Sequence, residues 1–205
     1  MLKIGVLISG GGTNLQAIID NIDHGYINGK IELIISNRED AYGLVRGQKA
    51  GIETLYVNPK DFKNNQEYDL KLIKELKDRE IDLIVLAGYL KILSADFIME
   101  FKNRIINIHP SLIPSFCGDG YYGEKVHKGV LDYGCKITGA TVHIVDEGTD
   151  TGPIILQRSV EVAENETVQS LQQKVLEIEH KILVEAIKLF SDNRISVEGR
   201  RVKIV

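Results

Sequence analysis

The sequence has few cysteines, few prolines and no long hydrophobic run. Of its 205 residues, two are cysteines and four are prolines. Cys117 and Cys135 are too few for a disulfide scaffold and too far apart for a C-x-x-C redox pair. No apolar run approaches the roughly 20 residues that cross a membrane. The chain also begins on an apolar, strand-like segment that lacks the pattern of a secretory signal. These absences predict a reduced, cytoplasmic protein with no membrane partner.

An excess of positive charge is also missing. The 25 Lys and Arg residues face 29 Asp and Glu residues, which gives a net charge of −4. Such a balance offers no general attraction to a polynucleotide, so we expect no nucleic-acid partner. A small phosphorylated substrate remains compatible, because it needs only a local anion site. The 43% hydrophobic and 26% charged residues are typical of a globular domain that folds without disulfide bonds or metal ions.

Continuous apolar runs alternate with helix-like stretches through the first half of the chain. Continuous rather than alternating apolar character favours strands that are covered on both faces, as in a parallel sheet flanked by helices. We expect strands over Leu2–Ser9, Ile31–Ser36, Glu53–Val57, Asp82–Ala87 and Arg104–Ile108, and helices over Asn14–Asp23, Gly43–Ala50, Tyr68–Lys77 and Ser94–Phe101.

The pattern changes after Pro110. A Gly- and Tyr-rich loop (Ser115–Gly123) precedes an expected helix, and two long strand-like runs then predict an antiparallel pair. A later helix carries one apolar stripe. The expected elements are a helix over Glu124–Leu131, strands over Ile137–Val145 and Pro153–Val162, a helix over Val168–Phe190 and a hairpin of Ile195–Val197 with Val202–Val205. The prediction is a single α/β domain, 1–205, with a sheet that is parallel early and mixed late.

Three consecutive glycines join the first strand to the first helix, in Ser9–Asn14. Such a loop lets the first N–H groups of the helix point outward, where they attract an anion; a plain glycine-rich turn is the alternative. The ATP-loop template fails because no lysine follows the glycines, and the dinucleotide template fails because Leu15 fills its third glycine position. Arg38 keeps a phosphorylated nicotinamide cofactor open as an alternative. A phosphate monoester fits better.

Asn107-Ile108-His109-Pro110 is the most informative stretch. Alternation along a strand puts Asn107 and His109 on one face, and Pro110 holds His109 in an extended conformation. An amide donor beside an imidazole suits acyl-group chemistry, with an oxyanion to stabilise and a proton to move. The alternative is that both residues merely cap a strand. The five histidines show no metal-binding spacing, so we expect no metal, and His143 is expected to be a packed, hydrogen-bonded side chain.

A polar loop, Val145–Pro153, carries three carboxylates: Asp146, Glu147 and Asp150. A carboxylate that faces His109 would raise the pKa of the imidazole and favour its cation. Sequence spacing alone does not select among the three.

These motifs together resemble the glycinamide ribonucleotide formyltransferases, the folate-dependent formyltransferase family of purine synthesis. The resemblance covers nearly the whole chain, through Ile8–Ala17, Leu86–Leu93, Asn107–Pro114 and Gly139–Gln157. It implies a Rossmann-like formyltransferase fold with helices on both faces of the sheet. It also implies a catalytic trio of Asn107, His109 and Asp150, the last in the loop before Gly-Pro-Ile-Ile-Leu-Gln.

The resemblance further implies the reaction and the binding residues. The amine of glycinamide ribonucleotide would attack the formyl carbon of 10-formyltetrahydrofolate. The enzyme would be a monomer or a homodimer. Residues 1–108 would form the nucleotide-phosphate-binding half and residues 109–205 the folate-binding and catalytic-loop half. The implied ribonucleotide-binding residues are Gly12, Thr13, Asn14 and Glu179, and the implied folate-binding residues are Lys91, Ile92, Leu93, Asp146, Glu147 and Asp150.

Two departures from the family pattern stand out. Lys91 replaces an arginine that is common in the family, and the Cys117–Gly123 stretch is longer than in many relatives. Two other functions stay open as alternatives. One is formyl transfer to initiator methionyl-tRNA or to water, although those enzymes usually carry a further domain for which 205 residues leave no room. The other is a nucleotide-sensing module that uses only the Gly10–Gly12 loop.

Overall fold

A computed structural model describes residues 1–205 as nine strands in one sheet, six α-helices and one short 3-10 helix. The strand order is β3-β2-β1-β4-β5-β6-β7-β9-β8. The strands are β1 (Leu2–Ile8), β2 (Gly29–Ser36), β3 (Thr54–Tyr56), β4 (Leu83–Leu86), β5 (Ile105–His109), β6 (Ile137–Ile144), β7 (Ile154–Glu161), β8 (Ile195–Glu198) and β9 (Arg201–Ile204). The helices are α1 (Thr13–Asp23), α2 (Tyr42–Lys49), η1 (Pro59–Asp61), α3 (Asn65–Asp78), α4 (Ala95–Glu100), α5 (Glu124–Tyr133) and α6 (Val168–Ser191).

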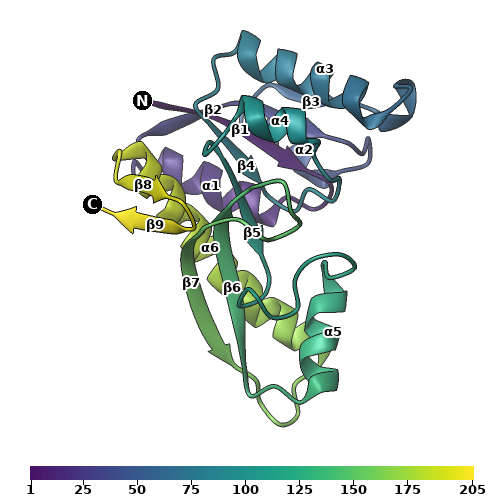
Figure 1. The fold of residues 1–205 in the computed structure, drawn as a ribbon, viewed down its shortest axis with the longest axis vertical. Helices are drawn as coiled ribbons and strands as arrows, with labels where there is room; N and C mark the ends of the chain where they lie inside the picture. The colour runs from purple at the N-terminus through teal and green to yellow at the C-terminus, as the bar shows by residue number, and fades with distance from the viewer.

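The sheet changes character at β6. Strands β1 to β5 pair in parallel, whereas β6 is antiparallel to both β5 and β7. In Figure 1, β6, β7 and α5 extend below the parallel part of the sheet, with α6 behind them. This arrangement confirms the predicted mixed sheet, with antiparallel strands in the C-terminal half.

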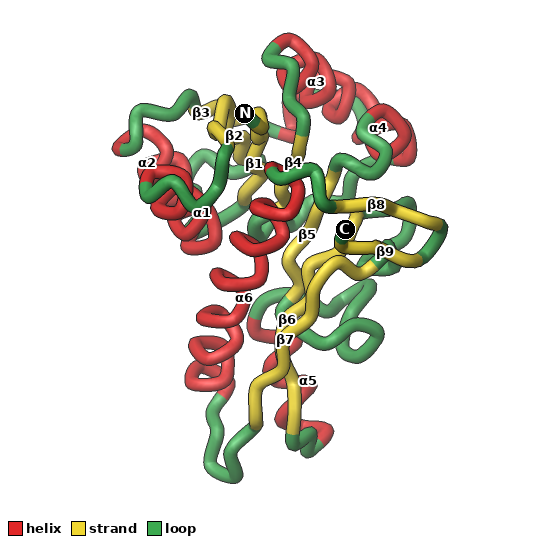
Figure 2. Tube along the Cα trace, turned by 90° about the vertical axis from the view of Figure 1, so that its left-hand side faces the viewer, coloured by secondary structure: helices red, strands yellow, loops and turns green.

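Helices cover both faces of the sheet, as predicted (Figure 2). One core contains the apolar sides of α1, α2 and α6, and the other contains those of α3 and α4. Within β1, Val6 and Ile8 face the first core while Leu7 faces the second. A strand buried on both faces needs apolar residues at every position, which explains the continuous apolar runs of the sequence.

The expected helices and strands are present, with bounds that differ by three residues or fewer. Two features were not predicted. The η1 turn begins where the Asn58 side chain accepts a hydrogen bond from the Lys60 N–H at 3.1 Å. The terminal hairpin joins the sheet through a parallel pairing of Ile154 with Arg201. No helix in the structure is both long and apolar enough to span a membrane.

Candidate active site

A cavity of about 590 Å³ opens at the carboxyl ends of β4 and β5. Ligands in open α/β sheets bind beyond the carboxyl ends of the parallel strands. The cavity is lined by the segments after β4, β5 and β6, by Gly118–Gly123, and by side chains of α1, α5 and α6. Most of the predicted site residues line it; Gly12 and Thr13 lie outside its lining.

Asn107, His109 and Asp150 converge in this cavity. His109 Nδ1 lies 3.4 Å from Asp150 Oδ2, and Asn107 Nδ2 lies 3.4 Å from Asp150 Oδ1. The other two carboxylates of the loop point elsewhere. Asp146 Oδ1 accepts hydrogen bonds from Gly148 and Thr151 of its own loop, and Glu147 is exposed. The structure thus brings Asp150 to His109, a choice that spacing had left open.

The backbone of the loop explains how Asp150 reaches the site. Asp150 has a φ of 58°, a left-handed conformation that aspartate tolerates better than most residues. A Cβ at Gly152 would lie 1.8 Å from the Ile144 carbonyl oxygen, so only glycine fits where the loop returns to β7. The Gly118 N–H donates to Asp150 Oδ2 at 3.0 Å and secures the carboxylate.

The electrostatics of the pair differ from the prediction. Burial lowers the pKa of His109 below its usual value, and it outweighs the opposing effects of the Asp150 charge and the Phe116 carbonyl. The Asp150 charge raises this pKa, as predicted for a facing carboxylate, but burial has the larger effect, so the cation is not favoured overall. Burial alone would raise the pKa of Asp150, but the His143 and His109 imidazoles and the Gly118 N–H keep it below its usual value. Asp150 is consequently ionised at neutral pH.

Sequence reasoning treated His143 as a packed side chain, and the structure shows that it also belongs to the site. It is 2% exposed and its Nδ1 lies 2.8 Å from the Ile144 carbonyl oxygen. A carbonyl oxygen only accepts hydrogen bonds, so Nδ1 carries a hydrogen in this contact, and Nε2 faces Asn107 and, at 3.6 Å, Asp150 Oδ1. Asn107 Nδ2 lies 3.2 Å from that Nε2, and this contact orients the amide. The pairing of Asn107 with His143 across β5 and β6 creates the contact.

His127 is a second histidine that sequence reasoning did not assign. It lies on α5, lines the cavity and is 2% exposed. Its Nδ1 is buried without a hydrogen-bond partner, and burial lowers its pKa to about 4. His127 is therefore neutral at pH 7. Its place on the buried side of α5, beside Val126 and Val130, made it resemble an ordinary core position.

The glycine loop has the geometry of an open helix N-terminus. Gly12 adopts a φ of 71°, and a Cβ there would lie 2.6 Å from the Gly43 Cα, so the position requires glycine. Helix α1 begins at Thr13 without a side-chain cap. Its first N–H groups are available to an anion. Arg46, which sequence reasoning missed, donates from Nε to the Gly11 carbonyl at 2.8 Å and adds positive charge beside the loop.

Arg38 does not face an empty anion site. Its Nε and Nη2 donate to the two carboxylate oxygens of Asp40 at 3.0 and 2.8 Å. The pair is exposed and lies within one turn, so the structure gives the nicotinamide alternative no further support.

Asn14 and Glu179 meet inside the cavity although 165 residues separate them in the chain. Asn14 Nδ2 donates to Glu179 Oε2 at 2.7 Å. Burial raises the pKa of Glu179 to about 7, against a smaller opposite effect of Asn14. Asn14 Oδ1 is buried and has no partner. This buried polar pair can bind a polar ligand group, since an unsatisfied acceptor is costly.

The Leu90–Leu93 segment forms another wall of the cavity. Ile92 is 67% exposed, whereas Leu93 is buried. The Lys91 side chain reaches back to α3, where Nζ donates to Asn65 Oδ1 at 2.5 Å and lies over the Tyr68 ring. A hydrogen bond of 2.7 Å between the hydroxyls of Tyr68 and Tyr89 holds the start of the segment.

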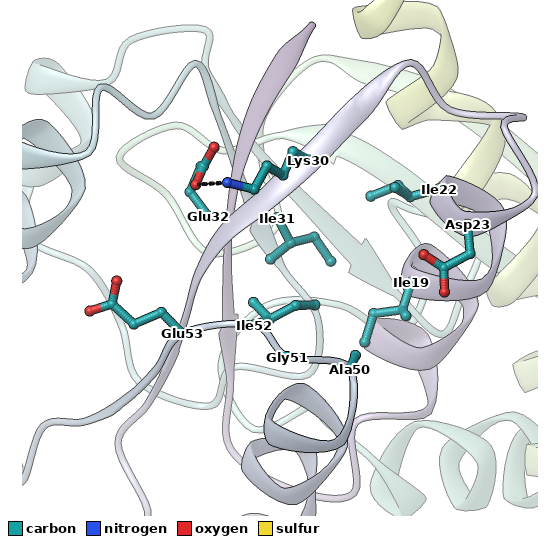
Figure 3. A pocket seen from close by; sticks show the side chains of 10 residues that line it. All are labelled: Ile19, Ile22, Asp23, Lys30, Ile31, Glu32, Ala50, Gly51, Ile52 and Glu53. Carbon is teal, nitrogen blue, oxygen red and sulfur yellow. Dashed lines mark hydrogen bonds and ion pairs between the residues drawn. The ribbon is translucent and has the colours of Figure 1, made fainter.

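A second cavity, of about 420 Å³, contains none of the predicted site residues. Figure 3 shows its apolar side chains from α1, β2 and the turn before β3, with one ion pair of 2.7 Å between Lys30 and Glu32. No group of three or more His, Cys, Asp or Glu side chains in the structure is arranged to hold a metal ion.

Comparisons with known proteins indicate the family of this chain. The model of the family described as formyl transferase matches residues 2–187. Phosphoribosylglycinamide formyltransferase of Haemophilus influenzae is 41% identical over 198 residues, covering 97% of this chain and 91% of that protein. The solved structure of glycinamide ribonucleotide transformylase 1 from Symbiobacterium toebii is 45% identical, with a TM-score of 0.95, and the match covers 100% of this chain and 94% of that one. The human trifunctional purine biosynthetic protein adenosine-3 is 39% identical over 195 residues, but the chain spans only 19% of its length.

Proposed function

Because this chain belongs to the formyl transferase family, we propose that it transfers the formyl group of 10-formyltetrahydrofolate to the amine of glycinamide ribonucleotide in de novo purine synthesis. The observation that carries the proposal is the convergence of Asn107, His109 and Asp150 in one cavity with the Asn14–Glu179 pair. The names of the similar enzymes support the choice of acceptor. We propose a cytoplasmic enzyme that acts as a monomer or homodimer.

The chemistry begins when the amine nitrogen attacks the formyl carbon and the carbonyl electrons move onto oxygen. Asn107 Nδ2–H and the His109 imidazole are donors to this oxyanion. One such donor typically contributes about 3 kcal/mol to the barrier. Holding both substrates in the right geometry can contribute more, up to roughly 7–11 kcal/mol.

The proton follows a path that the pKa directions support. His109 is largely neutral in the ligand-free site, because burial lowers its pKa. Asp150 is ionised and accepts the proton that the attacking amine releases. From Asp150 the proton reaches His109, so the imidazolium forms as the oxyanion does. The C–N bond to N10 of the folate then breaks, and N10 takes that proton as tetrahydrofolate leaves.

The ribonucleotide is proposed to bind along α1. Gly12, Thr13 and Asn14 would hold its 5′-phosphate at the open helix N-terminus, with Arg46 nearby. Glu179 would bind the ribose or the glycinamide end, since its carboxyl lies inside the cavity. This assigns the nucleotide phosphate to the 1–108 half of what we propose is a single domain.

The folate is proposed to bind on the other side of the trio. The segment with Lys91, Ile92 and Leu93 and the loop with Asp146, Glu147 and Asp150 both line the cavity. Backbone groups of these two walls would bind the pterin, and Lys91 would contact the folate tail. The 109–205 half thus supplies the catalytic loop and one wall of the folate site.

The decisive assay gives the purified protein 10-formyltetrahydrofolate with glycinamide ribonucleotide, with initiator methionyl-tRNA, or with neither, and follows folate release spectroscopically. We expect release to depend on the ribonucleotide. Release without an acceptor would identify a hydrolase, and release only with the tRNA would identify the other transferase; either result refutes the proposal.

Asp150→Asn tests the assigned chemistry. We expect it to reduce kcat by roughly 100-fold or more, because the amide cannot accept the amine proton, while ribonucleotide binding measured by calorimetry changes little. Asp132→Asn is the matched control, since it makes the same change at an exposed position of α5 that does not line the cavity. Near-normal turnover in the Asp150 variant would contradict the assigned role.

A further inference from the structure

The Phe116–Gly123 loop contacts the catalytic pair through its backbone. The Phe116 carbonyl oxygen lies 2.9 Å from His109 Nε2, and the Gly118 N–H donates to Asp150 Oδ2 at 3.0 Å. Both residues of the proposed proton path are therefore bonded to one short segment of chain. No side chain of the loop takes part in these two contacts.

The contact with Phe116 has a definite chemical meaning. A carbonyl oxygen only accepts hydrogen bonds, so His109 Nε2 must carry a hydrogen to make this bond. The neutral ring therefore gains its second proton at Nδ1 when it becomes the cation. That nitrogen lies 3.4 Å from Asp150 Oδ2, in the cavity where the reactants meet.

Packing of the Phe116 side chain holds its carbonyl in place although the Phe116 backbone is strained. Phe116 has a φ of 48°, an uncommon conformation for an aromatic residue. Its ring packs edge-to-face against Tyr121 and Tyr133, with centroids 5.9 and 6.1 Å away. Gly129 of α5 leaves room for the ring, since a Cβ there would lie 3.2 Å from it. Packing against Tyr121 of the loop and Tyr133 of α5 thus holds a strained backbone against His109.

We infer that Phe116 is a positioning residue whose carbonyl fixes the tautomer of His109 and makes Nδ1 the nitrogen that exchanges the proton. The inference rests on the proposed function for the identity of the reactants. The tautomer itself is a property of the free enzyme. An experiment without substrates therefore tests the inference separately from the proposed function.

The first test needs no variant that alters the loop. Protein labelled with ¹⁵N in its histidine rings is titrated by NMR, and the His109 signals are assigned by their absence from the spectrum of His109→Gln. The ring ¹⁵N shifts distinguish a hydrogen on Nε2 from one on Nδ1. We expect the neutral ring to be the Nε2–H form. A predominant Nδ1–H form, or an even mixture, would overturn the inference.

The second test removes the packing. Phe116→Leu is compared with Phe190→Leu, which makes the same change on α6 away from the cavity. We expect only the Phe116 variant to shift His109 toward a mixture of tautomers and to lower its pKa, because the carbonyl bond supports the cation. Its kcat should fall about tenfold or more through loss of a fixed ring orientation, with an unchanged ribonucleotide KM.

Phe116→Tyr keeps the edge-to-face contacts and should restore both the tautomer and kcat. Equal effects of the two leucine variants on the His109 signals would reduce Phe116 to a structural role and refute the inference. If Phe116→Leu does not fold, Gly129→Ala replaces it, because its methyl group presses on the same ring; an unchanged His109 tautomer and kcat in a folded Gly129→Ala would likewise count against it.

Discussion

Replacing Glu179 with glutamine is expected to raise the free energy of unfolding at pH 8 and to leave it nearly unchanged near pH 4.5. The side chain is 9% exposed, and burial raises its pKa from 4.5 to about 7. At about 1.4 kcal/mol per pH unit, the gap between these two values corresponds to a penalty of about 3 kcal/mol on the folded state above pH 7.

The sign of this effect follows from proton binding. The unfolded carboxyl group loses its proton near pH 4.5, whereas the folded one keeps it until about pH 7. The folded state therefore binds more protons across this window, and stability falls as the pH rises through it. Glutamine does not titrate, and its amide oxygen still accepts the hydrogen bond from Asn14. The variant should lack the fall in stability.

The assay is thermal and urea unfolding of both proteins at pH 4.5, 6, 7 and 8. A gain of about 3 kcal/mol corresponds to a rise in Tm of roughly 6–12 °C for a chain of this size. Glu177→Gln is the matched control, because it makes the same change at an exposed position of α6. A difference between Glu179→Gln and the unchanged protein that is the same at every pH, or no gain at pH 8, would refute the reasoning.

Two further predictions concern the walls of the cavity. Gly12→Ala should lower the free energy of unfolding by about 1–3 kcal/mol, because a side chain is strained at this φ and its Cβ meets Gly43. Calorimetry should also show at least tenfold weaker ribonucleotide binding. An unchanged affinity would show that the phosphate does not bind at this loop. Tyr68→Phe and Tyr89→Phe break the hydrogen bond that holds the start of the Leu90–Leu93 segment. A double-mutant cycle should give a coupling of about 1 kcal/mol and a higher KM for the folate alone, and a rise in the ribonucleotide KM instead would contradict it.

Local patterns predicted much of the site because they repeat the geometry of a strand or a helix. Alternation along β5 put Asn107 and His109 on one face, and the glycines after β1 indicated the open N-terminus of α1. The apolar stripe on α6 was also predictable from the sequence, and Leu171 and Val175 are buried as a helical period requires. Each of these features depends on residues only a few positions apart.

Sequence patterns could not predict the contacts between segments that lie far apart in the chain. His143 was recognised as buried, but its contact with Asn107 depends on the register of β5 against β6. Arg46 resembles any exposed arginine until α2 is packed beside the glycine loop. The net pKa of His109 depends on how many atoms surround it, and burial outweighed the carboxylate that the sequence had indicated.

The sequence by itself determined the order of helices and strands, the mixed sheet, the glycine loop and the Asn-x-His motif, and through its resemblance the formyltransferase family. Spacing alone did not select among Asp146, Glu147 and Asp150; the resemblance implied Asp150, and the tertiary structure places that carboxylate beside His109. It also decided that Asn14 meets Glu179 across 165 residues and that Phe116 contacts His109. The physical reason is that propensity and periodicity act over a few residues, whereas burial, charge pairing and close approach depend on chain segments that only folding brings together.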